Sequence, residues 1–347
     1  MKIALAQINP TIGDFEHNTE KMMAYIERAR GLACDLVVFS ELVICGYPPR
    51  DLLEKESFVA ANLNHLHRLV RSVRGIGVIC GFVDRNPHQE GRPLHNSVAL
   101  FGGGKILHAV HKRVLCRHDF DENTYFEPGS QAVAFPYKDR KIALTICEEV
   151  LNEKGVFSTG KPRGDPLARM VEQGADLIVN IAASPYHVGK REFKWDVLYN
   201  VAKRYRVPLV YVNQVGGNDS LLFDGISTAF DSTGRIAARA RDFEEDMVVF
   251  DTDTQKGDTL PISQSDTESL LKALVMGTRD YTHKCGFKKA LVGISGGIDS
   301  AVTACIAVKA LGGENVLSVF MPYRHTSRHS VEDAKALAKN LRIELLY

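Results

Sequence analysis

The sequence lacks the features that mark several classes of protein. Its 347 residues carry 43 Lys and Arg against 42 Asp and Glu, which leaves a formal net charge of +1. Because no overall positive field is present to hold a polyanion, we do not expect nucleic acid as a partner. No apolar run approaches the roughly 18 to 20 residues that a membrane span requires, and the N-terminus has no signal-peptide cleavage pattern. We therefore expect a cytoplasmic protein with no membrane partner.

Paired cysteines are also missing. The seven cysteines are odd in number, scattered along the chain, and include no CxxC pair. A disulfide framework or a zinc knuckle is therefore not expected. Each cysteine is either a thiol in the hydrophobic core or one with a chemical function. They are Cys34, Cys45, Cys80, Cys116, Cys147, Cys285 and Cys305.

The composition and periodicity of the chain predict two domains. Hydrophobic residues make up 45% and charged residues 24%, as in ordinary soluble proteins, and the length of 347 residues favours about two domains. Over residues 1–253, nine short apolar runs alternate with four amphipathic stretches, a pattern typical of a layered α/β domain. Helices are expected at 15–30, 52–74, 165–173 and 191–206, and the runs 97–106 and 227–240 each read as one strand. The polar segment 254–268 is predicted to be a linker before a second domain at 269–347.

The second domain begins as a Rossmann-like, doubly wound parallel sheet. We expect a helix that begins with Asp266 or Thr267 as its N-cap and stops at Gly286. After it the sequence predicts a strand, a glycine-rich loop, a helix, a strand, a helix and the start of a third strand. An open parallel sheet needs further strands and helices on both faces to bury itself. We therefore expect an incomplete domain, whose last 61 residues, 287–347, are mobile unless they pack against another fragment or chain.

The loop GISGGIDS carries the chemistry of the second domain. It follows an apolar strand and opens a helix, so its backbone N–H groups and the helix dipole can face an anion. The Walker A spacing GxxxxGK[ST] is absent, which disfavours P-loop phosphoryl transfer. A glycine-rich turn with Asp299 as a helix-terminal charge is the simpler alternative. The residues proposed to bind nucleotide are Gly293, Ile294, Ser295, Gly296, Gly297, Ile298, Asp299 and Ser300.

SGGIDS resembles the PP-loop of the ATP pyrophosphatases. The resemblance implies that the loop holds the pyrophosphate of ATP and that Asp299 helps to bind Mg²⁺.

The first domain has no GxSxG, HExxH or Ser-His-Asp signature, so another nucleophile must be sought. Cys147 follows the apolar run KIALTI, Glu41 follows DLVVFS, and Lys112 follows the run that ends at His111. A carboxylate can accept the thiol proton, and an ammonium together with the backbone N–H of Glu148 can stabilise an oxyanion. Taken singly, a cysteine in a strand is usually a core thiol, and Glu41 and Lys112 would most often be solvated surface charges.

Three segments resemble the motif regions of the nitrilase (carbon-nitrogen hydrolase) superfamily: FSELVICGYPPRDLL, HKRVLCRHDFDENTYFEPG and LTICEEV. The resemblance covers residues 1–253. It implies Glu41 as general base, Lys112 as oxyanion stabiliser and Cys147 as nucleophile, with no cofactor. The implied fold is an α-β-β-α four-layer sandwich.

The combination of this domain with SGGIDS is similar to the glutamine-dependent NAD synthetase family. The resemblance implies that glutamine supplies ammonia, and that deamido-NAD is adenylated by ATP with Mg²⁺ and then amidated, in a homo-oligomer. It implies glutamine contacts from Ser184 and Lys190, and from His118 where family members often carry Tyr.

Two alternatives stay open: a stand-alone amidase with an inert C-terminal segment, and a non-catalytic scaffold. Because the deamido-NAD contacts would lie beyond Tyr347, we expect this chain to hydrolyse glutamine without synthesising NAD or binding ATP tightly.

Overall fold

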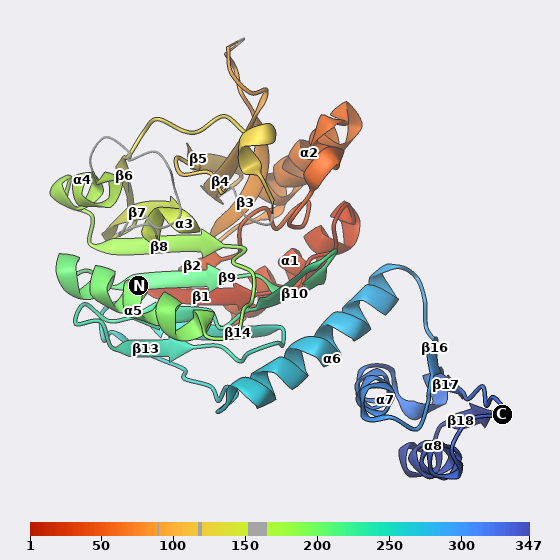
Figure 1. Ribbon diagram of the computed structural model, residues 1–347. Coiled ribbons are helices and arrows are strands. Elements are labelled where there is room, and N and C mark those ends of the chain that lie inside the picture. Colours follow the sequence, from red (N-terminus) through yellow and green to blue (C-terminus); the bar gives the residue numbers. More distant parts are fainter. Residues whose placement is uncertain (89, 117–119, 152–164) are drawn as a thin grey trace. The chain divides into compact units, whose positions relative to one another are not determined.

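The computed structural model describes residues 1–88, 90–116, 120–151 and 165–347. The chain divides into two compact units, drawn in Figure 1. The first comprises Met1–Gly216 and Phe223–Ser263, and the second comprises Gly217–Leu222 and Gln264–Tyr347. In the described part of the chain, no helix has both the length and the apolar character needed to span a membrane.

Two β-sheets form the centre of the first unit. The seven-stranded sheet has the order β15-β14-β1-β2-β3-β4-β5 and the six-stranded sheet has the order β13-β12-β9-β8-β7-β6. The strands of the first sheet are β1 (Lys2–Gln7), β2 (Leu36–Val38), β3 (Gly77–Arg85), β4 (Leu94–Gly102), β5 (Lys105–His111), β14 (Asp246–Asp251) and β15 (Lys256–Gly257). Those of the second are β6 (Ala134–Tyr137), β7 (Arg140–Ile146), β8 (Leu177–Ala182), β9 (Leu209–Asn213), β12 (Thr228–Phe230) and β13 (Ile236–Arg239). A separate hairpin consists of β10 (Val215–Asn218) and β11 (Leu221–Asp224).

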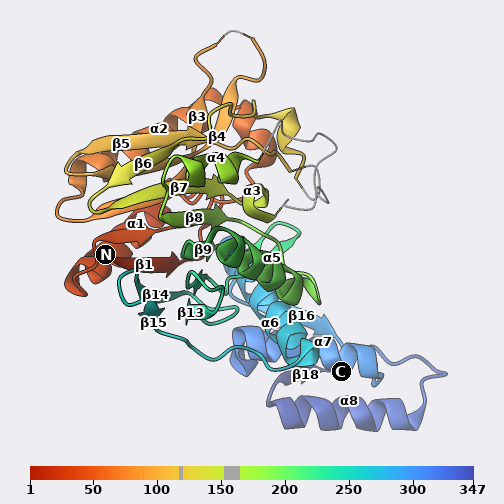
Figure 2. The ribbon, with the colours of Figure 1, turned by 90° about the vertical axis from the view of Figure 1, so that its left-hand side faces the viewer.

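The alternation of side chains along β1 explains how the layers stack. Ile3 and Leu5 belong to the apolar cluster that includes Leu144 of the other sheet, whereas Ala4 packs in the cluster that includes Met22 of α1. Successive residues of a strand point to opposite faces, so one face of the first sheet meets the second sheet and the other meets helices. Helices α1 (Phe15–Gly31) and α2 (Glu56–Ser72) cover the first sheet; α4 (Pro166–Glu172) and α5 (Lys190–Tyr205) pack on the second. The expected α-β-β-α sandwich is confirmed (Figures 1 and 2).

The four expected helices of this unit are present, but two expected single strands are hairpins. Residues 97–106 span parts of β4 and β5, which turn at Gly103 and Gly104, both with positive φ. Residues 227–240 likewise contain β12 and β13, joined through Gly234. In both cases a glycine that tolerates the left-handed region reverses the chain inside an apolar run. Short elements were also missed from sequence, among them β6 and the four-residue helix α3 (Glu148–Leu151).

The second unit carries a three-stranded parallel sheet in the order β16-β17-β18. Its elements are α6 (Asp266–Lys284), β16 (Ala290–Gly293), α7 (Ile298–Leu311), β17 (Val316–Val319), α8 (Arg328–Leu341) and β18 (Glu344–Leu346). The N-cap of α6 is Ser265, whose side chain accepts from the Glu268 N–H, and not Asp266 or Thr267 as expected. Gly286, with φ of +81°, follows the end of that helix as predicted. Within the expected linker, residues 256–257 form β15 beside β14.

One glycine of the first sheet determines how closely the chain of Glu41 can approach it. A Cβ at Gly81 of β3 would lie 2.2 Å from the Leu42 nitrogen and 2.7 Å from the Glu41 Cα. We expect Gly81→Ala to lower the free energy of unfolding by roughly 1 to 3 kcal/mol, because the backbone must shift to admit the methyl group. Urea unfolding measures this change. Gly31→Ala is the control, since no atom lies within 4 Å of its new Cβ at the end of α1; equal midpoints for both variants would contradict the prediction.

Candidate active site

The three residues implied as catalytic all directly follow or lie close to strand ends. Lys112 comes directly after β5, Cys147 directly after β7, and Glu41 three residues after β2. The Lys112 Nζ lies 2.7 Å from Glu41 Oε1, and both side chains are almost completely buried. The Cys147 thiol is also buried, within electrostatic reach of both charges. The structure therefore brings together, inside the protein, three residues that lie 35 or more positions apart in the sequence.

The Lys112 ammonium contacts two further carboxylates. Its Nζ lies 2.8 Å from Glu122 Oε2 and 3.1 Å from Glu148 Oε2. Burial alone would lower the pKa of Lys112, but Glu122, Glu148 and Glu41 outweigh it and hold this pKa well above its usual range. Lys112 is therefore a permanent buried cation, as the expected stabilisation of an oxyanion requires.

Hydrogen bonds fix the two fully buried carboxylates around Lys112. The Asn96 side-chain amide donates to Glu41 Oε1 at 2.7 Å and to Glu122 Oε1 at 2.8 Å. The Ala183 N–H donates to Glu41 Oε2, and the Cys116 N–H donates to Glu122 Oε2. Glu41 is consequently held in one orientation by donors from three different parts of the chain.

The backbone at Cys147 has a conformation that is unusual for a residue with a side chain. Its φ is +47°, and its N–H donates to Ile181 of β8 at 2.8 Å. Burial, Glu148 and Glu41 raise the pKa of the Cys147 thiol well above its usual range, although Lys112 opposes them. The thiol is therefore protonated at neutral pH and needs a base at the moment of attack.

The structure describes two of the three residues implied as glutamine contacts, Ser184 and Lys190. His118 lies outside the described residues. Ser184 is buried just after β8, with its N–H donating to Asn213 Oδ1 at 2.9 Å. Lys190 begins α5 and donates to the Pro185 carbonyl. Burial and the neighbouring Lys194 lower the pKa of Lys190, while Cys147 and Glu148 act in the opposite direction.

The glycine-rich loop lies between β16 and α7, as the sequence predicts. Ser295 Oγ accepts from the Gly297 N–H at 3.3 Å and lies 3.1 Å from Ser300 Oγ. Gly296 has φ of +79°, and a Cβ there would lie 2.3 Å from the Ser330 carbonyl oxygen of α8. Asp299 is exposed in the first turn of α7.

Sequence reasoning missed several polar and charged residues of the site. Glu122 and Asn96 complete the cluster around Lys112, and only the position of Glu122 inside a quoted motif could have suggested it. A second buried ion pair joins Lys194 of α5 to Asp224 of β11, with Nζ 3.1 Å from Oδ1. Lys194 lies one helical turn after Lys190, so the spacing alone gave a weak signal for it.

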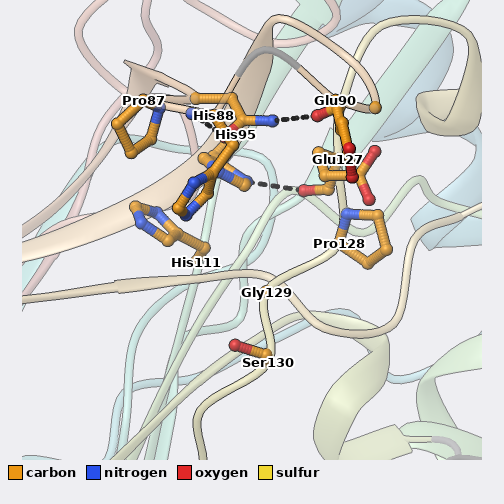
Figure 3. Close-up of a pocket in the computed structure, with 11 residues that line it drawn as sticks. Pro87, His88, Glu90, His95, His111, Glu127, Pro128, Gly129 and Ser130 are labelled. Carbon is orange, nitrogen blue, oxygen red and sulfur yellow. Dashed lines mark hydrogen bonds between the residues drawn. The ribbon is translucent and has the colours of Figure 1, made fainter.

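A polar pocket of about 510 Å³ lies near the same strand ends (Figure 3). The rings of His95 and His111 stack there at 4.1 Å between centroids, and His95 Nδ1 lies 2.7 Å from the Glu127 carbonyl oxygen. Its lining residues are Asn86, Pro87, His88, Glu90, Gly91, His95, His111, Glu127, Pro128, Gly129 and Ser130. Each of the two stacked histidines directly precedes a residue of the charged cluster, Asn96 or Lys112. None of Glu41, Lys112 and Cys147 lines this pocket.

A four-layer sandwich that buries glutamate, lysine and cysteine at its strand ends defines a protein of the nitrilase type. The carbon-nitrogen hydrolase family model matches residues 2–261, and the chain belongs to that family. The NAD synthase family model matches residues 270–347.

The similar proteins share both parts of the chain. A glutamine-dependent NAD(+) synthetase from Synechocystis sp. is 44% identical over 98% of this chain and 62% of its own length. One from Thermotoga maritima is 35% identical over 99% of this chain and 64% of its own length. The structure of the Acinetobacter baumannii glutamine-dependent NAD+ synthetase in complex with ADP has a TM-score of 0.90 at 35% identity, covering 99% of this chain and 64% of that one. The chain thus spans a little over three fifths of these relatives.

The structure of an amidase from Nesterenkonia sp. resembles part of this chain in fold. Its TM-score is 0.61 at 22% identity, and the match covers 72% of this chain and 89% of the amidase.

The protonation of Glu122 gives a test of the charged cluster around Lys112. Burial raises the pKa of Glu122 to about 7, against the opposing attraction of Lys112. Between pH 4.5 and 7 the folded state holds a proton that the unfolded chain has lost, so this group makes stability fall as pH rises. We expect Glu122→Gln to flatten that fall, by on the order of 1 kcal/mol per pH unit.

Urea unfolding at pH 5, 6 and 7 measures the effect, with the exposed Glu54→Gln as the control variant. Parallel stability curves for Glu122→Gln and the parent protein would show that Glu122 does not titrate in this range.

Proposed function

We propose that this chain is the glutamine-hydrolysing part, together with the beginning of the ATP-using part, of a glutamine-dependent NAD synthetase. The observation that carries the proposal is the buried contact between Glu41 and Lys112, within electrostatic reach of the buried Cys147. The glycine-rich loop of the second unit and the 44% identity to the Synechocystis sp. synthetase support the ATP-dependent half.

The first unit hydrolyses an amide in two stages. Glu41 accepts the thiol proton as Cys147 Sγ forms a bond to the side-chain carbonyl carbon of glutamine. The negative charge that develops on the carbonyl oxygen is stabilised by the Lys112 ammonium and the Glu148 backbone N–H. Collapse of this intermediate breaks the C–N bond, and the proton held by Glu41 leaves with ammonia.

The second stage uses water. Glu41 takes a proton from a water molecule that attacks the thioester carbon. The C–S bond then breaks, glutamate is released, and Glu41 returns the proton to Cys147 Sγ. Asn96 and the Ala183 N–H keep Glu41 oriented for both transfers. Because Lys112 stays charged throughout, it serves the oxyanion in each stage.

Glutamine is recognised through its free amino acid end. The cation of Lys190 suits the α-carboxylate, and Ser184 and His118 are the further residues proposed to donate hydrogen bonds to glutamine. Lys190 lies within the electrostatic reach of Cys147, which supports its place beside the bound substrate.

The second unit uses ATP to adenylate deamido-NAD, with AMP and pyrophosphate as products. The first turn of α7, which no side chain caps, together with the hydroxyls of Ser295 and Ser300, fits a phosphate group. Asp299 would hold Mg²⁺ together with phosphate oxygens. We further place the enzyme in the cytoplasm as a homo-oligomer.

The nucleophile gives the first test. Cys147→Ala should lower glutamine hydrolysis by on the order of 10³-fold or more, because no other group forms the thioester. Release of glutamate and ammonia by the 347-residue chain measures this change. Cys285→Ala, at an exposed position, should retain the parent rate; a parent chain that releases no glutamate would contradict the proposed function.

The cation gives the second test. Lys112→Ala should slow formation of the thioester by on the order of 10²-fold or more, as expected when one oxyanion partner is lost. Mass spectrometry of rapidly quenched samples follows the enzyme-bound acyl group, and circular dichroism verifies that the variant is folded. A near-normal rate in a folded variant would remove Lys112 from the mechanism.

A further inference from the structure

Glu149 is a fourth carboxylate near the cluster, and it accepts hydrogen bonds from four N–H groups without contacting Lys112. Glu149 Oε1 accepts from the Arg113 backbone N–H and from Arg113 Nε, both at 2.7 Å. Glu149 Oε2 accepts from the Ile146 N–H at 2.7 Å and from Arg113 Nη2 at 2.9 Å. The two side chains are 8% and 3% exposed, so this is a buried, bidentate ion pair.

The sequence positions of these contacts give the pair its significance. Arg113 directly follows Lys112, while Ile146 and Glu149 lie on either side of Cys147. Strand β5, which leads to Lys112, belongs to the first sheet, and β7, which leads to Cys147, belongs to the second. Backbone hydrogen bonds between strands connect strands of the same sheet only, so they do not connect the end of β5 to the end of β7. The Arg113–Glu149 ion pair makes that connection.

The same carboxylate also holds the turn at the nucleophile. Cys147 donates to β8, so the Ile146 N–H points to the opposite side of β7. On that side, β6 pairs with β7 only over residues 140–143 and does not reach Ile146. The Ile146 N–H donates to the Glu149 carboxylate instead. The bond between residues 146 and 149 thereby closes the chain around Cys147, whose φ of +47° is rarely adopted without such support.

We propose that Arg113 and Glu149 are positioning residues, which hold the ammonium of Lys112 and the thiol of Cys147 at the separation that amide attack requires. This inference rests on the proposed function of the first unit. Catalytic groups must be held to within about 0.5 Å, and a misplacement of about 1 Å can reduce a rate by on the order of 10². A lysine at position 113 keeps the charge but loses the planar fork that binds both carboxylate oxygens.

A purely structural pair would behave differently. Buried ion pairs contribute little net stability, and breaking one lowers the folded fraction. That loss changes the amount of active enzyme but not the turnover of each folded site. Turnover per folded site, and the chemistry of the thiol itself, therefore separate the two roles.

The first experiment compares Arg113→Lys and Glu149→Gln with the parent 347-residue chain. We expect kcat for glutamine hydrolysis, corrected for the folded fraction, to fall by about 10- to 100-fold with KM changed less than about threefold. The control is Arg85→Lys, because Arg85 makes a two-pronged pair with Glu56 on the surface. Unchanged kcat per folded site in both variants, or a rise in KM alone, would overturn the proposal.

The second experiment needs no substrate. Iodoacetamide alkylation of Cys147 at one fixed, mildly alkaline pH is followed by mass spectrometry, since only the thiolate reacts. Displacing Lys112 from the thiol should lower the alkylation rate in both variants and leave the rate of Arg85→Lys unchanged. If the parent chain hydrolyses no glutamine, the proposed function fails and the alkylation rate alone decides the positioning role; an unchanged rate in both variants would overturn it.

Discussion

The buried ammonium of Lys112 is the interaction on which the rest of the site depends. One cation lies among Glu41, Glu122 and Glu148, so the four side chains together are negatively charged when all are ionised. A buried charge is tolerated only when it is paired and hydrogen-bonded. The raised pKa of Glu122 relieves the excess, because a proton on that carboxyl brings the cluster closer to neutrality. Asn96 and two backbone N–H groups donate hydrogen bonds to the carboxylate oxygens of Glu41 and Glu122.

The four-layer fold makes this cluster possible. Strands β2, β5, β7 and β8 end near one another, so side chains just beyond their ends converge without exposure to solvent. The two sheets and their helices bury the apolar residues on both faces of each strand, which leaves the strand ends for polar chemistry. The close approach at Gly81 shows how little space separates Glu41 from the neighbouring strand.

The proposed function assigns a different chemistry to each unit. Cys147 and Lys112 would serve amide hydrolysis in the first unit, and the glycine-rich loop before α7 would serve phosphate binding in the second. The matches to the carbon-nitrogen hydrolase and NAD synthase family models fall on residues 2–261 and 270–347, in agreement with this division of labour. Their succession in one chain is the reason to favour a glutamine-dependent synthetase over an amidase with an inert appendage.

The sequence by itself determined the fold class, the helices of the first unit and the glycine-rich loop. These depend on local patterns: apolar periodicity for α1 and α5, and adjacent glycines between β16 and α7. Glu41, Lys112 and Cys147 could be found because each lies in a recognisable local motif. The tertiary structure decided which other groups join them. Asn96 lies 55 residues from Glu41 and Arg113 lies 36 residues from Glu149, and no local pattern encodes contacts between residues so far apart in the chain. The backbone turn at Cys147 was equally invisible, since a positive φ in a residue with a side chain is imposed by its tertiary hydrogen bonds.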